Sequence, residues 1–250
     1  MTVPASDVEL GFAPDWPAPE HVRAFVTCRT GGVSTGAYAS LNLGTHVGDD
    51  PDAVAENRRR VAERLGLPSE PRWLDQVHGT TILDLDRDGP APADGAVTGR
   101  PGVVCVVVTA DCLPVLLTNR HGTRVGVAHA GWRGLAAGVV ENAVRALGSP
   151  PSEILAWLGP AIGPGAFEVG DEVRAAFAAA GFEAADAFVR NARGRWQADL
   201  YTLARQSLAR SGVTAVYGGG ACTYTDAERF FSHRREAPCG RMASLVWIDR

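Results

Sequence analysis

The chain has 250 residues, and its 24 basic residues against 28 acidic ones give a net charge of −4. All of the basic residues are arginines, because the sequence contains no lysine. The missing lysine amine excludes Schiff-base aldolases, pyridoxal-phosphate enzymes, phosphate loops that end in Gly-Lys-Ser/Thr, and Ser-x-x-Lys acyl enzymes. The slightly negative charge also gives no support for nonspecific binding to nucleic acid or to an anionic membrane.

The composition is typical of a soluble globular protein, with 46% hydrophobic and 21% charged residues. No internal repeat or clear linker interrupts it, so we expect one domain over residues 1–250. The longest apolar stretch, 103–109, is too short to span a bilayer, and the acidic N-terminus with Asp7, Glu9 and Asp15 does not resemble a signal peptide. The odd number of five cysteines then favours reduced thiols and a cytoplasmic location.

The first half of the chain contains one clear helix and three clear strands. Asp49-Asp50-Pro51 opens a helix that runs to about Leu65, where Gly66 ends it. The β-branched run 103–109 is typical of a strand buried on both faces. Strands at 114–118 and 123–128 follow, joined by the turn 119–122.

The second half is mainly helical until its last strand. Helices are predicted over 135–147, 171–180 and 199–209, ended by Gly148, by Gly181 and near Gly212. A closing strand is predicted over 242–248. Because hairpins and helices are mixed without a regular strand–helix alternation, the pattern predicts an α+β fold, with packed mixed sheet and helices outside it.

Three segments place metal-binding side chains among unusual neighbours: Gln76-Val77-His78-Gly79, Ala110-Asp111-Cys112-Leu113-Pro114 and His129-Ala130-Gly131-Trp132-Arg133-Gly134. The turn 119–122 relates the last two. In a regular hairpin around it, residues whose numbers sum to 241 lie opposite each other, which pairs Cys112 with His129. Opposed Cα atoms are roughly 4.5–5.5 Å apart, close enough for both side chains to bind one zinc ion. A bulge would shift this register by one residue.

Cys112 and His129 would supply two ligands, and a third from a distant segment would leave the fourth position open, as in catalytic zinc sites. Spacing alone does not select His78 over His21, His46 or His233. Spacing is equally compatible with a buried thiol and a hydrogen-bonded histidine that bind no metal.

The three segments, in this order, closely resemble the laccase-domain family, first called multicopper polyphenol oxidases and now described as zinc-dependent purine nucleoside enzymes. The resemblance covers nearly the whole chain. It also includes the stretches 25–34, 39–44, 157–160, 167–170, 230–235 and 240–243.

The resemblance implies that His78, Cys112 and His129 bind zinc. It implies phosphorolysis of adenosine, inosine and methylthioadenosine with phosphate, some adenosine deamination, and small-molecule substrates as partners. The family fold is two packed mixed β-sheets flanked by helices, in layers α-β-β-α. The sequence departs from many relatives near 159–167, where family cysteines that are not zinc ligands are replaced by Ala161, Gly165 and Ala166.

Phosphate needs an anion site, and without lysine that site must use arginine, backbone amides or the metal. Arg29 is the first candidate because Gly31-Gly32 follows it, and Arg133 and Arg234 are the next. Each arginine has an alternative role in a salt bridge. The catalytic candidates are Cys112, His129 and Asp111, although Asp111 would only brace its loop if the strand pointed it away from Cys112.

Two other enzyme functions remain open from the sequence. A copper polyphenol oxidase is less favoured, because only six histidines are present and no His-x-His pair occurs. A peptidoglycan-precursor editing hydrolase would use Cys112 as nucleophile and His129 as its base. A non-enzymatic interaction module would leave the Cys, His and Arg motifs without a purpose.

Overall fold

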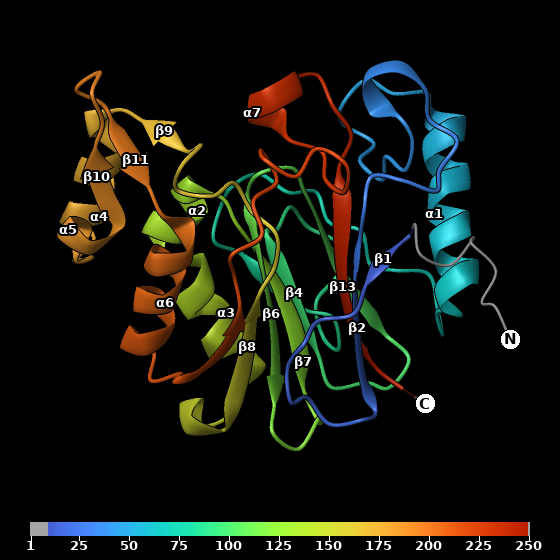
Figure 1. Cartoon of the computed structure of the whole chain (residues 1–250). Helices are drawn as coiled ribbons and strands as arrows, with labels where there is room; N and C mark the ends of the chain where they lie inside the picture. Colours follow the sequence, from blue (N-terminus) through green and yellow to red (C-terminus); the bar gives the residue numbers. More distant parts are fainter. Residues whose placement is uncertain (1–9, 250) are drawn as a thin grey trace, which may run out of the picture.

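Two packed β-sheets form the centre of the computed structural model, which describes residues 10–249 (Figure 1). The smaller sheet has the strand order β1-β2-β13-β5, formed by Gly11–Phe12, Val22–Thr27, Met242–Ile248 and Val104–Thr109. The larger sheet has the order β12-β8-β6-β7-β4-β3, formed by Ala215–Gly218, Ile154–Leu158, Leu113–Asn119, Val125–Ala130, Gly95–Thr98 and Ile82–Asp84. Asp7 and Glu9, which informed the expectation of no signal peptide, lie outside the described residues.

A buried apolar layer joins the two sheets. Cys105 and Val107 of β5 pack in the same cluster as Leu116 of β6 and Val127 of β7. These strands are buried on both faces, which explains why β5 and β6 are nearly continuous apolar runs.

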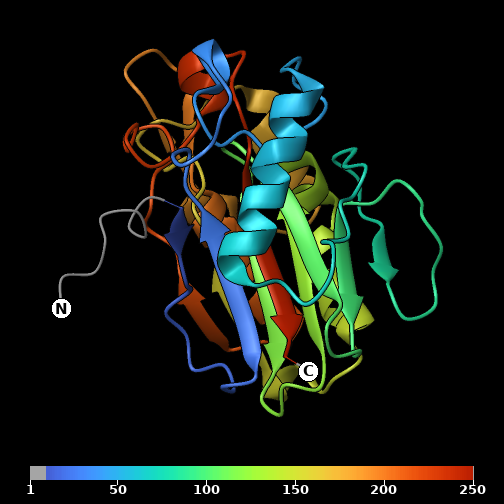
Figure 2. The same cartoon turned by 90° about the vertical axis from the view of Figure 1, so that its right-hand side faces the viewer.

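Helices cover the outer faces of both sheets. α1 (Pro51–Leu65) packs Val61 against the smaller sheet, and Figure 2 shows this helix in front of the strands. α3 (Val139–Leu147) and α6 (Leu200–Arg210) cover the larger sheet. The layers are therefore α-β-β-α, and the predicted α+β fold is confirmed.

A small third sheet lies beyond these layers and was not predicted. Its order is β10-β11-β9, formed by Phe188–Arg190, Trp196–Ala198 and Glu168–Val169. It lies beside α4 (Asp171–Ala179) and α5 (Ala184–Ala187) at the left of Figure 1. The remaining short helices are η1 (Gly36–Tyr38), η2 (Pro151–Glu153) and α7 (His233–Glu236).

Local capping explains why most helix ends agree with the sequence prediction. Asp50 accepts a hydrogen bond from the Asp52 backbone N–H at the start of α1, and Gly66 ends the helix in the left-handed region. Asp199 caps α6 in the same way through the Tyr201 N–H. These signals are local, so the sequence contains them in full.

The helix predicted over 135–147 is wrong as a single element. The structure divides this region into α2 (Trp132–Ala137) and α3, with Gly138 between them at φ +97°. The Gly138 N–H bonds to the carbonyls of Gly134 and Leu135 and ends the first helix. Glycine thus ends one helix here and begins the next.

The register predicted for the β6–β7 hairpin is also wrong, because it assumed that the numbers of paired residues sum to 241. Paired residues sum to 243, so Pro114 lies opposite His129, and Thr118 opposite Val125. The connection is longer than expected because the Asn119 side chain accepts from the Thr123 backbone N–H at 2.9 Å and holds a wider turn. Cys112 therefore lies before the first residue of β6.

Within residues 10–249, no helix is long and apolar enough to cross a membrane.

Candidate metal centre

The three motif segments meet at one end of the sandwich, the end where α2 and α7 lie (the upper end in Figure 1). His129 lies near the end of β7, and Cys112 immediately precedes β6. His78 comes from a loop that runs toward β3. Three separate parts of the chain thus supply one side chain each.

Their ligand atoms form a compact group. One ligand atom from each of His78, Cys112 and His129 lies within 4.8 Å of the other two. The Cys112 Sγ is 3.7 Å from the His78 Nε2, and the two imidazole rings meet edge to face with centroids 4.7 Å apart. Within residues 10–249 this is the one such group of His, Cys, Asp or Glu, so the geometry selects His78 as the third member.

The register error does not separate Cys112 from His129. Asp111 has φ +85°, so the chain turns sharply just before Cys112. Cys112 lies beyond the last β6 pair, Leu113 with Ala130, and is only partly buried. The Cys112 thiol still lies close to His129, because one ligand atom of each is within 4.8 Å of the other.

A buried carboxylate that the sequence analysis missed supports this group. Asp94 is fully buried, and its Oδ1 lies 2.8 Å from the Nδ1 of His129. Burial by itself raises the pKa of Asp94, but hydrogen bonds from His129, Gly79 and His78 outweigh it and lower the pKa. Asp94 is therefore ionised at neutral pH, and the His129 Nδ1–H donates to it, which leaves Nε2 for a metal.

The signal for Asp94 was present in the sequence but weak. It stands in Ala93-Asp94-Gly95-Ala96, a charged residue among small apolar ones at the start of a strand. Such a carboxylate needs a buried partner. The partners lie at positions 77–79 and 129, and only the tertiary structure brings them close.

The thiol and the imidazole of the group influence each other. Burial tends to raise the pKa of Cys112, but the charges and hydrogen bonds of His129 and His78 lower it to about 6. For His129, burial tends to lower the pKa, whereas Cys112 and Asp94 raise it to about 9. Thiolate is the form of Cys112 that binds metal, so this environment favours the ligand form.

Gly131 leaves the space that the group occupies. A Cβ on this residue would lie 2.8 Å from the Cδ2 of His78 and 3.1 Å from the Sγ of Cys112. Both distances are too short for an unshifted side chain. The glycine after His129-Ala130 is therefore required by close packing against two of the three side chains.

The carboxylate of Asp111, predicted as a catalytic candidate, is held by other parts of the chain. Its Oδ1 accepts from the Thr223 hydroxyl at 2.6 Å, and its Oδ2 from the Arg234 backbone N–H at 2.7 Å. Its carbonyl accepts from the Ile162 N–H. These contacts correspond to the bracing alternative, and a role in acid–base chemistry stays a prediction.

The three predicted phosphate-binding arginines differ in how far they are engaged. Arg29 pairs with Glu236 at 2.9 Å, donates to the carbonyls of Ala39 and Ala227, and lies over the ring of Phe231. Its side chain is only 17% exposed. Phosphate binding by Arg29 stays a prediction, and it would require these contacts to open.

Arg234 and Arg133 lie nearer to the surface. The Arg234 guanidinium donates to the carbonyl of Glu168 at 2.9 Å. Arg133 is exposed and lies over the ring of Trp132, 4.4 Å from its centroid. In the described part of the chain, the Arg133 guanidinium takes part in no ion pair, which makes it the most available of the three for an anion.

The other histidines considered as ligands do not join the group. His21 lies against Gly122 in the β6–β7 turn, and His233 begins α7. His46 is exposed, and burial together with the charges of Arg241 and Arg58 lowers its pKa.

The donor set fits a zinc ion. One thiolate and two imidazoles are borderline-soft ligands, and three protein ligands leave one position open, as catalytic zinc sites require. The Asp94–His129 contact supplies the outer partner that metal-binding histidines usually have.

Residues 23–249 match the sequence model of the family described as multi-copper polyphenol oxidoreductase laccase. The chain belongs to this family. A Pseudomonas aeruginosa protein named a purine nucleoside phosphorylase is 60% identical over 95% of this chain and 98% of its own length. The purine nucleoside phosphorylase YfiH of Escherichia coli is 54% identical over the same shares.

Solved structures agree with the fold. A crystal structure of a Neisseria meningitidis protein has a TM-score of 0.91 and 51% identity, and covers 96% of this chain and 99% of that one. The YfiH protein of Bacillus licheniformis has a TM-score of 0.85 and 32% identity, over 91% and 93% of the two chains.

Proposed function

We propose that this protein is a purine nucleoside phosphorylase that cleaves a purine nucleoside with phosphate at the end of the sandwich that holds His78, Cys112 and His129. The observation that carries the proposal is the likeness, over nearly the full length, to proteins named purine nucleoside phosphorylases. The compact His-Cys-His group supports it, because it provides a place for chemistry in this fold.

His78, Cys112 and His129 would hold zinc, which we propose in preference to copper. A zinc ion at such a site supplies Lewis-acid chemistry at an open coordination position. Copper remains compatible with the family description, and bound copper together with oxygen uptake on a phenol would support the oxidase alternative.

Phosphate would be held by arginine, since the chain has no lysine. Arg133 is the first choice because its guanidinium is exposed and lies four residues after His129. Arg234 is the second; it lies in α7, and its backbone N–H donates to Asp111.

The substrates we propose are adenosine, inosine and methylthioadenosine, with adenosine deamination as a side activity. We expect the enzyme to act in the cytoplasm on small molecules, without a nucleic-acid or membrane partner. Asp111 is the proposed acid–base group of the site, beside Cys112 in the chain.

The test couples metal analysis to a nucleoside assay on the purified protein. Wild-type protein should contain about one zinc per chain and release hypoxanthine from inosine at a rate that saturates with phosphate. Cys112→Ala should lose zinc and turnover together. Arg133→Ala should keep its zinc and raise the KM for phosphate. Full turnover in zinc-free Cys112→Ala, or release of hypoxanthine that ignores phosphate, would contradict the proposal.

A second candidate is the peptidoglycan-precursor editing hydrolase, which the Cys112–His129 pair favours. Their mutual effect on pKa is what a cysteine nucleophile and its base require. Metal removal separates the two functions. A nucleophilic Cys112 would keep its hydrolase activity after chelation and lose it on alkylation, whereas the metal-dependent phosphorylase would lose activity on chelation.

A further inference from the structure

The Asp94 carboxylate contacts two of the three side-chain positions of the metal centre. It precedes β4, is fully buried, and accepts four hydrogen bonds from the described residues. Three of the donors are consecutive backbone N–H groups of the loop that contains His78. The fourth is the imidazole of His129.

The two carboxylate oxygens divide these donors in an ordered way. Oδ1 accepts from the His78 backbone N–H at 2.9 Å and from the His129 Nδ1–H at 2.8 Å. Oδ2 accepts from the N–H groups of Val77 and Gly79 at 3.3 and 2.5 Å. A single oxygen atom therefore links the main chain of one metal-binding residue to the ring of another.

The main chain of Asp94 strengthens this link. Its carbonyl accepts from the His129 N–H at 2.7 Å, and its own N–H donates to the Thr81 carbonyl at 2.9 Å. Asp94 and His129 are thus joined by one backbone and one side-chain hydrogen bond.

The loop needs such a support because its backbone is strained. His78 has φ +59°, which residues other than glycine adopt uncommonly. Strained residues persist where surrounding contacts over-determine them, and they occur often at functional sites. Three backbone N–H groups pointing at one buried carboxylate supply that constraint.

We propose that Asp94 is a positioning residue of the metal centre, which fixes the ring of His129 and the loop of His78 in the arrangement that binds metal. This inference rests on the metal centre of the proposed function, but not on phosphorolysis. The residue does not touch the metal itself. It acts through the two histidines.

Asp94→Asn is the informative substitution because it keeps the size of the side chain and removes the second acceptor. An amide has one acceptor oxygen, and its NH2 group would face N–H donors on the other side. Whichever way the amide points, either the Val77–Gly79 pair or the His78–His129 pair loses its acceptor. The metal-binding geometry loosens, since the loop or the ring is freed.

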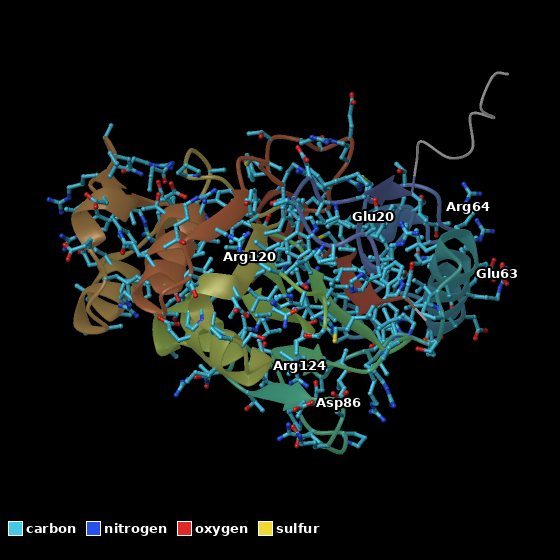
Figure 3. All side chains as sticks on the ribbon, turned by 90° about the horizontal axis from the view of Figure 1, so that it is seen from below. Glu20, Glu63, Arg64, Asp86, Arg120 and Arg124 are labelled. Atoms are coloured by element: carbon cyan, nitrogen blue, oxygen red, sulfur yellow. The ribbon has the colours of Figure 1, made fainter. Side chains whose placement is uncertain are left out.

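Asp86 offers a matched control at the other end of β4. It also accepts from a backbone N–H, that of Gly99, and from the side chains of Thr98 and Arg124. Thr98 and Gly99 lie at the far end of β4 from Asp94, and Figure 3 labels Asp86 and Arg124 near its lower edge. Asp86→Asn therefore tests the loss of a structural carboxylate without touching the metal centre.

The experiment measures the Kd for Zn2+ by chelator competition, with Co2+ absorption spectra as a report on ligand geometry. Circular dichroism and Tm confirm that each variant is folded under the assay conditions. Asp94→Asn should bind Zn2+ about 10- to 100-fold more weakly than wild type and give an altered Co2+ spectrum. Asp86→Asn should lower Tm and keep the wild-type Kd and spectrum.

The outcomes separate this inference from the proposed function. A folded Asp94→Asn with the wild-type Kd and spectrum would overturn it, as would equal weakening of zinc binding in Asp86→Asn. Absence of metal binding by the wild-type protein would overturn it as well. If wild type binds zinc in an Asp94-dependent way but does not cleave nucleosides, the inference stands and the phosphorylase proposal fails.

Discussion

At the scale of single residues, the metal centre depends on Gly131, which is needed because it has no side chain. Gly131 has φ −64°, a value that any residue adopts, so the backbone does not require glycine there. The requirement comes from His78 and Cys112, which lie where its Cβ would be. Packing thus selects the residue type, and the local chain conformation does not.

Gly131→Ala should therefore weaken both metal binding and stability. The added methyl group must push away the His78 ring or the Cys112 sulfur, so we expect zinc affinity to fall at least about tenfold, as for other disturbances of metal-ligand positioning. The unfolding free energy should change by about 1–3 kcal/mol, the cost of overpacking. Chelator competition and urea unfolding measure the two effects. Gly89→Ala is the control, since nothing lies within 4 Å of its Cβ position.

The cysteines outside the metal centre differ in their expected reactivity. Burial tends to raise the pKa of Cys222, but hydrogen bonds from Thr225, Gly163 and Tyr224 outweigh it and lower the pKa. Cys105 is buried in the sheet core, and burial raises its pKa far above the usual range. Thiolate is the reactive form of both.

In the zinc-loaded protein at pH 7, iodoacetamide should therefore modify Cys222 well before Cys105. Because its pKa is lowered, the rate at Cys222 should already be high at a pH where an ordinary thiol is mostly protonated. Peptide mass spectrometry of timed samples measures both sites. Equal labelling of the two cysteines in folded protein would contradict this difference.

At the scale of elements, Gly138 decides between one helix and two. Alanines precede Gly138 and valines follow it, and such a sequence predicts one continuous helix. The structure instead has φ +97° at Gly138, which turns the chain between α2 and α3. This break lets Trp132 and Arg133 lie at the metal end while α3 covers the larger sheet.

Gly138→Ala distinguishes the two descriptions by the sign of its effect. In a continuous helix, alanine would stabilise the protein by about 0.5–1 kcal/mol. In the observed left-handed conformation it should destabilise by about 1–2 kcal/mol. The nearest atom to the new Cβ is 3.7 Å away, so the cost is in the backbone and not in a clash. Urea denaturation gives the sign directly, and a gain in stability would exclude the break.

At the scale of the whole molecule, the two ends of the sandwich have different roles. The metal centre lies at the end with α2 and α7, whereas an ion-pair network lies at the opposite end. Arg124 pairs with Asp84 at 3.2 Å and with Asp86 at 3.1 Å, and Figure 3 shows Arg124 beside Asp86. It also donates to the carbonyls at the end of α3.

Arg124→Met should therefore affect stability without affecting the metal. The variant keeps an apolar stem but removes the cation that Asp84 and Asp86 share, so that these carboxylates keep only the more exposed Arg87 and Arg100 as partners. The expected loss is about 1–2 kcal/mol, below the about 3–5 kcal/mol of a fully buried pair, because these side chains keep some contact with water. Zinc affinity should stay within twofold of wild type. A large loss of zinc affinity would mean that the two ends are coupled.

The sequence predicted those features that depend on neighbours in the chain. Helix α1 begins and ends where Asp50 and Gly66 predicted, because caps act within one turn. Strand β13 has the predicted bounds, because a continuous apolar run is a local signal of a buried strand. Cys112 and His129 were predicted to meet from hairpin spacing, and they do, although in a different register.

By itself the sequence determined most helix ends, the buried strands, the lack of a lysine amine and two candidate members of the metal centre. Spacing could not decide the third, because it does not distinguish His78 from His21, His46 or His233; the family resemblance implied His78, and the tertiary structure places it beside the other two. It also decided the role of Asp94, a buried charge whose hydrogen-bond donors lie at distant positions. A carboxylate is stable in such a place only when its donors surround it, and that arrangement forms only when the strands and loops pack.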